Sequence, residues 1–441
     1  MKLSVFRSSK GDCLLLQGEN GANLLIDGGM GNTYREFVRP TLGAMAEAGQ
    51  ALDLVYVSHI DQDHIAGILE LMEDTVAWKR FDYQQASGNA EFDPPEFPRP
   101  PEVKALWHNA FADQVGENQG PIEDQLVTNT RLTSAWTLFQ GEQRETIFNM
   151  AGEYQNLAAS IRQGLEITRR AWRQLNIPLN PQTGGKLFSV EDVAEAIPLG
   201  SLSLSVIGPF QVDLENLRED WNQWLKNNRD VVEEIQAEIE ADLAEHAGLR
   251  VMDEGQLLAS MLRPLITALG DRSAVTPPNL ASLMLLAEEG EHTVLLTGDG
   301  HADDILKGLE RRGKLNGEGR LHVDVLKFQH HGSKNNITAD FCRKITAPHY
   351  VFCGNGDHHN PHLDAVELLV EARAGLTGDH PQAGQPYKLW FNCSSRVAST
   401  KKRREHMALL EEKVAALGAE HPELSWHFSD SASFQVPVGG E

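Results

Sequence analysis

The chain has 441 residues, of which 41% are hydrophobic, and a formal net charge of -24. This length allows a large buried core. No stretch of eighteen or more apolar residues occurs, so we expect no membrane span. The acidic balance argues against charge-driven binding of duplex nucleic acid. A small phosphate-bearing substrate stays compatible, because bound divalent metals can supply local positive charge.

The N-terminal segment and the cysteines indicate where the protein is located. Arg7 and Lys10 interrupt the first apolar run too early for a signal peptide. The four cysteines form no CxxC pair, which makes a disulfide framework or a zinc ribbon improbable. We therefore expect free cysteines in a cytoplasmic protein.

The first sixty residues predict paired strands, a helix and a buried strand. Short apolar runs separated by Gly and Asn turns indicate hairpins, and they fall at residues 3–6, 13–18 and 23–29. A helix is expected from about Thr33 to Ala48. The apolar run LDLVYVS is typical of a buried strand. The Pro-rich segment 87–101 predicts a surface loop.

Two long segments of helical spacing occupy the middle of the chain. They predict helical insertions over about 110–200 and 210–265, with a short strand at 202–207 between them. We interpret their apolar stripes as surfaces that pack on the main domain, on a protein partner or on a second copy of the chain. The arginines between Arg162 and Arg173, like the KKRR run at 401–404, indicate either substrate contact or a solvated face.

Strand signals return after residue 281. We expect strands in the segments SLMLLAEE, HTVLLTGD, VDVLKFQHHGS, HYVFCGNG, YKLWFNC and ASFQVPV, with a helix over about 302–311. No internal repeat of fixed period is present. Strand pairs that alternate with single helices in both halves predict an α/β fold. This is an αβ/βα two-sheet sandwich with helices outside, formed as a single domain over residues 1–441.

Potential metal ligands crowd the junction after the buried strand. They are His59, Asp61, Asp63 and His64, with Asp53 a little upstream. Alternate residues at a strand end can project to the same side, and imidazole nitrogens and carboxylate oxygens bind zinc, manganese or iron. A hydrated turn with an N-capping Asp is the alternative. An HxDxDH segment between a buried-type strand and an apolar helix favours the metal site.

Two further strands end in the same kinds of residue. Asp299 follows VLLTG, and His330 with His331 follows VLKFQ. Each of these alone is a weak signal, because Gly-Asp turns and surface His pairs are common. Three strands of one chain that all end in potential ligands indicate a shared metal centre.

The order LLIDGG, SHIDQDHIAG, NLASL, LLTGD, HHGS resembles the metallo-β-lactamase superfamily. More narrowly, it is similar to the hydrolase domain of ComEC-type DNA-uptake competence proteins. The resemblance covers the core from residue 1 to about 370 and leaves the inserted helices unexplained. The superfamily pattern is HxHxDH, and here Asp61 stands at the second His. Asn279 stands in the segment where the superfamily has a third His.

This resemblance implies two divalent metal ions, zinc or manganese, and a role for each matching residue. Asp63 and Asp299 would serve catalysis as ligands, and Asp27 would support the site from outside the ligand set. His359 and His362, in a late His-Pro loop, are candidates for proton donation or substrate contact. The implied ligands are His59 and Asp61 for the first metal, Asp63, His64 and His331 for the second, Asp299 as the bridge, and His330 as the alternative to His331.

The chemistry that follows is hydrolysis. Two cations can share a hydroxide, lower its pKa towards neutral, and hold the attacking and leaving oxygens. The carboxylate of Asp61 favours a hard cation such as manganese, with zinc still open. We expect a phosphodiesterase acting on a nucleotide or a single-stranded nucleic-acid end. A hydrolase of lactones, esters or amides with the same fold, or an inactive partner-binding scaffold, are the alternatives.

Overall fold

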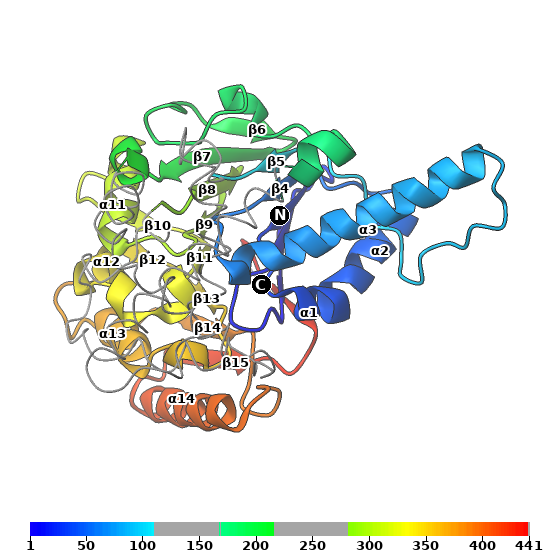
Figure 1. The fold of residues 1–441 in the computed structure, drawn as a ribbon. Helices are drawn as coiled ribbons and strands as arrows, with labels where there is room; N and C mark the ends of the chain where they lie inside the picture. The colour runs from blue at the N-terminus through cyan, green and yellow to red at the C-terminus, as the bar shows by residue number, and fades with distance from the viewer. Residues whose placement is uncertain (110–166, 168, 216–280, 440–441) are drawn as a thin grey trace, which may run out of the picture.

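Two β-sheets lie face to face at the centre of the molecule, with helices on their outer faces (Figure 1). This arrangement is seen in a computed structural model, which describes residues 1–109, 167, 169–215 and 281–439. Most of both predicted helical insertions, and Asn279 with them, lie outside the described residues. The mixed α/β architecture with two mixed sheets confirms the predicted two-sheet sandwich.

The first sheet has the strand order β16-β1-β2-β3-β4-β5. The strands β1, β2 and β3 form antiparallel hairpins, β16 from the end of the chain pairs antiparallel with β1, and β4 and β5 run parallel to β3. The predicted N-terminal hairpins are therefore confirmed. The strands of this sheet are β1 (Lys2–Phe6), β2 (Leu14–Gln17), β3 (Asn23–Ile26), β4 (Leu54–Tyr56), β5 (Leu106–Trp107) and β16 (Ser433–Val436).

The second sheet has the strand order β15-β14-β13-β11-β9-β8-β7-β6. Its first five strands are parallel, and the last three pair in antiparallel fashion. A separate two-stranded sheet joins β10 (Leu321–His322) to β12 (Ile345–Thr346). The strands of the second sheet are β6 (Ile197–Leu199), β7 (Leu202–Gly208), β8 (Met284–Glu289), β9 (His292–Leu296), β11 (Val325–Lys327), β13 (His349–Phe352), β14 (Tyr387–Phe391) and β15 (Leu424–Phe428).

Helices cover the outer face of each sheet. A helical stretch over residues 31–47 and the long α3 cover the first sheet, and four helices from α11 to α14 cover the second (Figure 1). The described helices near the first sheet are α1 (Gly31–Thr33), the π-helical η1 (Tyr34–Val38), α2 (Arg39–Glu47), α3 (Gln62–Ala86) and the π-helical η4 (Arg169–Leu175). Those near the second sheet are α11 (Ala302–Arg311), α12 (Ala339–Lys344), α13 (Leu363–Arg373) and α14 (Lys401–Glu420). None of the described helices is both long and apolar enough to cross a membrane.

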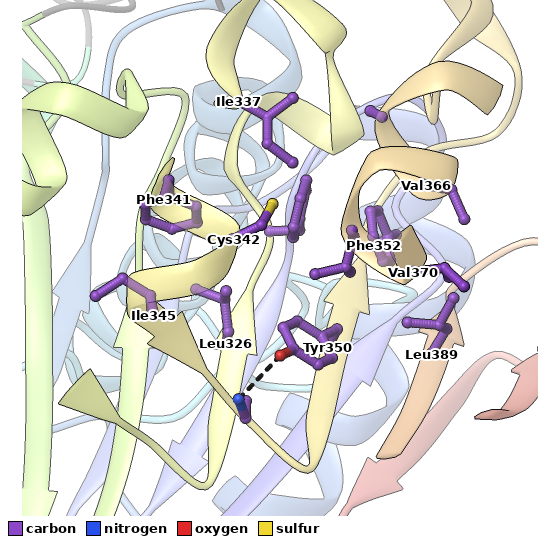
Figure 2. Packing of buried hydrophobic residues seen from close by; sticks show 14 of the residues in the cluster. Leu326, Ile337, Phe341, Cys342, Ile345, Tyr350, Phe352, Val366, Val370 and Leu389 are labelled. Atoms are coloured by element: carbon purple, nitrogen blue, oxygen red, sulfur yellow. Dashed lines mark hydrogen bonds between the residues drawn. The ribbon is translucent and has the colours of Figure 1, made fainter. Parts of the chain in front are cut away.

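Three clusters of buried apolar side chains pack between these layers. The middle cluster joins the two sheets, and includes Leu24 and Tyr56 from the first sheet and Val325 and Val351 from the second. A second cluster lies between the first sheet and its helices. The third packs α12 and α13 on the second sheet. It contains Phe341 of α12 together with Leu326 and Tyr350 of the strands below (Figure 2). Strands buried on both faces explain the continuous apolar runs of the sequence.

The sheet topology brings several chain segments to one edge. The carboxyl ends of β3 and β4 in the first sheet face those of β9, β11 and β13 in the second. A hydrogen bond of 2.7 Å from the Leu283 amide to the Ser58 carbonyl ties the two sheets together there. Loops at such an edge are where parallel sheets place their functional side chains.

The structure corrects one predicted boundary. The helical insertion expected over about 110–200 extends too far, because residues 176–200 contain turns, a 3-10 turn (η5, Pro181–Thr183) and the strand β6, but no helix of α type. Pro178, Pro181 and the pair Gly184-Gly185 explain the difference, since Pro and Gly interrupt a helix. The structure instead pairs Leu179 with Leu106 of β5.

Close backbone contact holds the start of α3 against the loop after β3, and a side chain added there would disturb it. A Cβ atom added at Gly67 would lie 1.9 Å from the Gly28 carbonyl oxygen. Helix propensity alone would make Gly67→Ala stabilising by about 1 kcal/mol. We expect the backbone clash to prevail and to lower the free energy of unfolding by about 1–3 kcal/mol.

Urea denaturation of both proteins measures this change. Gly317→Ala is the matched control, because Gly317 is exposed and no atom lies within 4 Å of an added Cβ. A Gly67→Ala protein as stable as wild type would show that α3 can move away from the first sheet.

Candidate metal centre

The turn from β4 into α3 carries the first group of candidate ligands. His59 and His64 are buried, while the side chains of Asp61 and Asp63 are 33% and 17% exposed. Asp61 is the N-cap of α3, yet its side chain makes no capping hydrogen bond. Its Oδ2 lies 3.6 Å from Nε2 of His59 instead. The alternative of a simple capped turn is therefore not what the structure shows.

Asp299, three residues beyond the end of β9, is the centre of the group. Its amide donates to Oγ of Ser282 over 3.2 Å, and the Asn336 side chain donates to its carbonyl over 2.8 Å. These contacts hold the buried carboxylate towards four imidazoles. The Nε2 atoms of His59, His64, His330 and His331 lie 3.7, 3.4, 3.6 and 3.4 Å from its oxygens.

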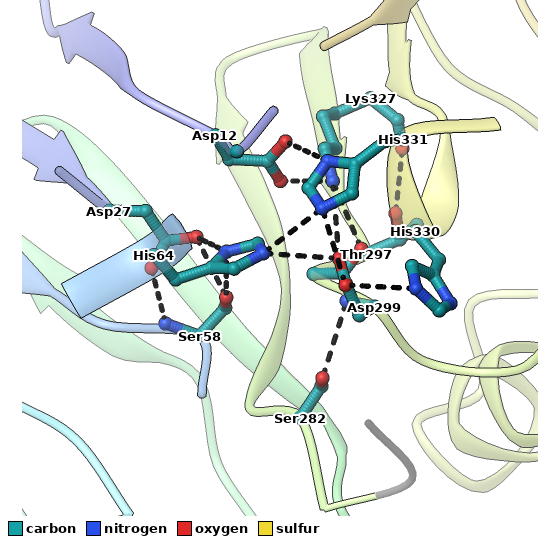
Figure 3. A network of polar contacts seen from close by, with 12 residues as sticks. Asp12, Asp27, Ser58, His64, Ser282, Thr297, Asp299, Lys327, His330 and His331 are labelled. Carbon is teal, nitrogen blue, oxygen red and sulfur yellow. Dashed lines mark hydrogen bonds and ion pairs between the residues drawn. The ribbon is translucent and has the colours of Figure 1, made fainter. Parts of the chain in front are cut away.

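His330 and His331 lie in η7 (Gln329–Gly332), directly after β11. Both have positive φ angles, 46° and 55°. Nε2 of His331 lies 3.3 Å from Nε2 of His64 and 3.6 Å from Oδ2 of Asp63, whereas Nδ1 of His330 meets Oδ1 of Asn336 at 2.8 Å. The left-handed backbone therefore directs two adjacent imidazoles to Asp299 from different sides (Figure 3).

The donor atoms have the spacing that a metal requires. Two ligands bound about 2.1 Å from a tetrahedral ion lie roughly 3.4 Å apart. The separations in this cluster run from 3.3 to 3.7 Å. Nε2 of His59 and Oδ1 of Asp299 are buried and have no hydrogen-bond partner among the described residues. Burying such atoms unpaired is costly, so the donor set fits a cation.

Two buried carboxylates contact the Nδ1 atoms of candidate ligands whose Nε2 atoms face Asp299. Oδ2 of Asp27 lies 2.8 Å from Nδ1 of His64, and Oδ1 of Asp12 lies 3.0 Å from Nδ1 of His331 (Figure 3). Such carboxylates fix the ring orientation and the tautomer of a metal-binding His. The supporting position predicted for Asp27 agrees with this geometry.

Asp12 was missed by sequence reasoning. It lies in the turn between β1 and β2, and no strand-end pattern marks it. One oxygen of Asp12, with donors of His64, Asp299 and His331, forms a buried group of potential ligand atoms that all lie within 4.8 Å of one another. Because its oxygens contact His331 and Lys327, we assign Asp12 to the support of the ligands and not to the ligands themselves.

The buried carboxylates of the cluster favour the protonated, positively charged forms of its imidazoles. Burial opposes protonation of His64, but the carboxylates of Asp299 and Asp27 prevail and raise its pKa well above the usual value. Burial opposes protonation of His331 too, and Asp299 with Asp12 nevertheless raises its pKa to about 9. Without a metal, these imidazoles therefore hold protons as counter-ions at neutral pH.

The predicted residues do not all meet at this point. Asp53 lies elsewhere, paired with Lys104 at 2.7 Å, so its grouping with the ligands is wrong. The ring of His359 packs on His406 of α14 with centroids 5.1 Å apart. The amide of His362 donates to the Gly332 carbonyl over 3.0 Å, immediately after His331. Whether His359 or His362 contacts a substrate stays a prediction.

The comparison with known families agrees with this geometry. Residues 9–80 match the sequence model of the Metallo-beta-lactamase superfamily. The matched segment runs from the turn before β2 into α3, and so includes Asp12, Asp27 and the ligands of the β4–α3 turn. No curated protein matches the chain significantly.

The fold and the candidate site agree with the family match over residues 9–80. The architecture is consistent with the metallo-β-lactamase fold, and most members of that superfamily are metal-dependent hydrolases. The buried His and Asp side chains at the strand ends could bind a metal ion.

The raised pKa values generate a prediction about pH. Metal ions must displace the protons of His64 and His331, so binding of Mn²⁺ should release protons at pH 7. Apparent affinity should rise from pH 7 towards about 9, where His331 loses its proton without a metal, and rise less above it. Calorimetry in buffers of different ionisation enthalpy measures the protons released. Binding without proton release would contradict this electrostatic description.

Proposed function

We propose that the protein is a metal-dependent phosphodiesterase. Its substrate would be a small phosphate-bearing molecule or a single-stranded nucleic-acid end. The observation that carries this proposal is the convergence of three strand-end turns on Asp299, which gives two sets of donors with one shared carboxylate. Such an arrangement suits two divalent cations, zinc or manganese.

The geometry favours a particular division of the ligands. Asp63, His64 and His331 form one set, in which the imidazoles are almost fully buried. His59, Asp61 and His330 form the other set, in which both imidazoles approach Oδ2 of Asp299. In this division the two adjacent histidines serve different ions, and His330 supplies the imidazole that the sequence lacks at Asn279.

The set with Asp61 is the more open one. The side chains of Asp61 and His330 are 33% and 26% exposed, whereas those of Asp63, His331 and His64 in the other set are 17%, 4% and 0% exposed. Substrate would approach from this side. When bound, the two ions would activate water at neutral pH and neutralise phosphate charge. The chain's own part is to orient the imidazoles through Asp12 and Asp27 and to hold the substrate.

The positive charge of Lys10 near the centre supports a phosphate over a neutral lactone. Lys10 is half-buried in the turn between β1 and β2, and its charge acts on both Asp63 and His358. The resemblance of the sequence motifs to ComEC-type hydrolase domains would imply the same substrate class, and the carboxylate of Asp61 would suit a hard cation there.

Substrate class is tested with two chromogenic assays under identical metal. We expect hydrolysis of bis-p-nitrophenyl phosphate with Mn²⁺ or Zn²⁺, little or no lactone turnover, and loss of activity in Asp299→Ala. Removal of metal by a chelator should abolish turnover, and added metal should restore it. Lactone hydrolysis with no phosphodiester hydrolysis in either metal would overturn the proposal.

Lys10 provides a test of the phosphate contact. Hydrogen bonds to charged groups contribute about 1.5–3 kcal/mol, so Lys10→Met should raise KM for a phosphodiester by roughly tenfold or more. The value of kcat should change less, because a binding contact acts in the ground state and the transition state alike. Lys2→Met, at an exposed position of β1, is the matched control. An unchanged KM would exclude Lys10 from substrate binding.

A further inference from the structure

Lys327, the last residue of β11, places an ammonium group directly beside the candidate metal centre. The side chain is 2% exposed. Its Nζ forms an ion pair with Asp12, donates to the Gly298 carbonyl over 3.0 Å, and lies 4.0 Å from Oδ1 of Asp299 (Figure 3). A buried charge is costly unless it is paired, so a lysine in a strand that is otherwise apolar needs a specific reason.

The contacts of Asp12 supply that reason. One of its oxygens meets Nδ1 of His331 at 3.0 Å, and the other pairs with Lys327. A carboxylate engaged at both oxygens has a fixed orientation, and it fixes the imidazole in turn. Nε2 of His331 is then directed at Asp63 and Asp299, at 3.6 and 3.4 Å.

Asp27 offers an internal comparison, because it supports His64 in the same way. Its remaining contacts are neutral: the amide and the hydroxyl of Ser58 each donate to it over 2.7 Å. Those donors belong to the same sheet as Asp27. Asp12 instead is held by a charged group from the opposite sheet, and that group also faces the shared carboxylate Asp299.

We propose that Lys327 is a positioning residue for metal binding, which acts through Asp12 to hold His331 and to keep Asp12 itself out of the ligand set. The second part follows from proximity, because an oxygen of Asp12 lies within 4.8 Å of donors of His64, His331 and Asp299. Without the ammonium, Asp12 could turn towards a cation. The proposal rests on the metal-binding function proposed above.

Lys327 also enters the charge balance of the centre. Five carboxylates belong to the ligands and their supports, namely Asp12, Asp27, Asp61, Asp63 and Asp299. With neutral imidazoles, two divalent ions and one ammonium cancel these five negative charges. Asp12 and Asp299 raise the pKa of Lys327 against the effect of burial, so the ammonium stays charged.

The test measures Mn²⁺ binding by calorimetry in the full chain. We expect two ions in wild type. Lys327→Met should weaken one of them by roughly 10- to 100-fold, as losses of supporting contacts to a ligand do, and should leave the other nearly unchanged. Lys104→Met is the control, since Lys104 forms an exposed ion pair with Asp53 away from the centre.

A double-variant comparison separates positioning from charge alone. Asp12→Asn should cause the same selective loss, and Lys327→Met added to it should cause little more, because Lys327 acts through Asp12. The double variant removes both buried charges, so it keeps the test available if Lys327→Met fails to fold. Additive losses, equal weakening of both ions, or unchanged binding in folded variants would overturn the proposal.

Failure of this proposal can be told apart from failure of the proposed function. If wild type binds two ions and the variants bind them equally well, only the role of Lys327 is refuted. If folded wild type binds no manganese and no zinc, both proposals are refuted.

Discussion

Crowding of buried negative charge is the constraint on which this structure depends. Asp299 is surrounded by four imidazoles, and further carboxylates lie behind or beside them. Such a group is stable only when cations fill it, and the raised pKa values of His64 and His331 express that need in the absence of metal. Metal binding at this centre would answer the same electrostatic condition as proton uptake by the imidazoles and the ion pair of the buried lysine.

Both sheets contribute residues to this group. The first sheet delivers His59, His64 and Asp12, and the second delivers Asp299 and His331. Neither half holds a full ligand set. The close contact of α3 with the loop after β3 fixes the ligand turn on the first sheet, and the hydrogen bond from Leu283 to Ser58 joins the two sheets. Backbone contacts directly beside the candidate ligands therefore help to determine their separations.

Sequence reasoning predicted the parts of the site that follow local patterns. Three buried strands that end in Asp or His predicted that the HxDxDH turn, Asp299 and the His pair lie together, because carboxyl ends of parallel strands meet at one edge. It could not give strand order or register, which depend on pairing between distant segments. It placed Asp53 in the cluster because of nearness in sequence alone. Asp12 and Lys327 escaped notice, since their pairing across 315 positions has no local signature; a lysine inside VLKF was the available signal.

The backbone of the His-rich turns has a consequence for how the protein could evolve. His330, His331, His358 and His359 all have positive φ angles, between 46° and 63°. Each such conformation costs a non-glycine residue on the order of 1–2 kcal/mol. Glycine or asparagine would fit these positions with less strain. At His330 and His331, a substitution by glycine would therefore relieve backbone strain and remove a candidate metal-binding imidazole, so that stability and the proposed chemistry oppose each other there.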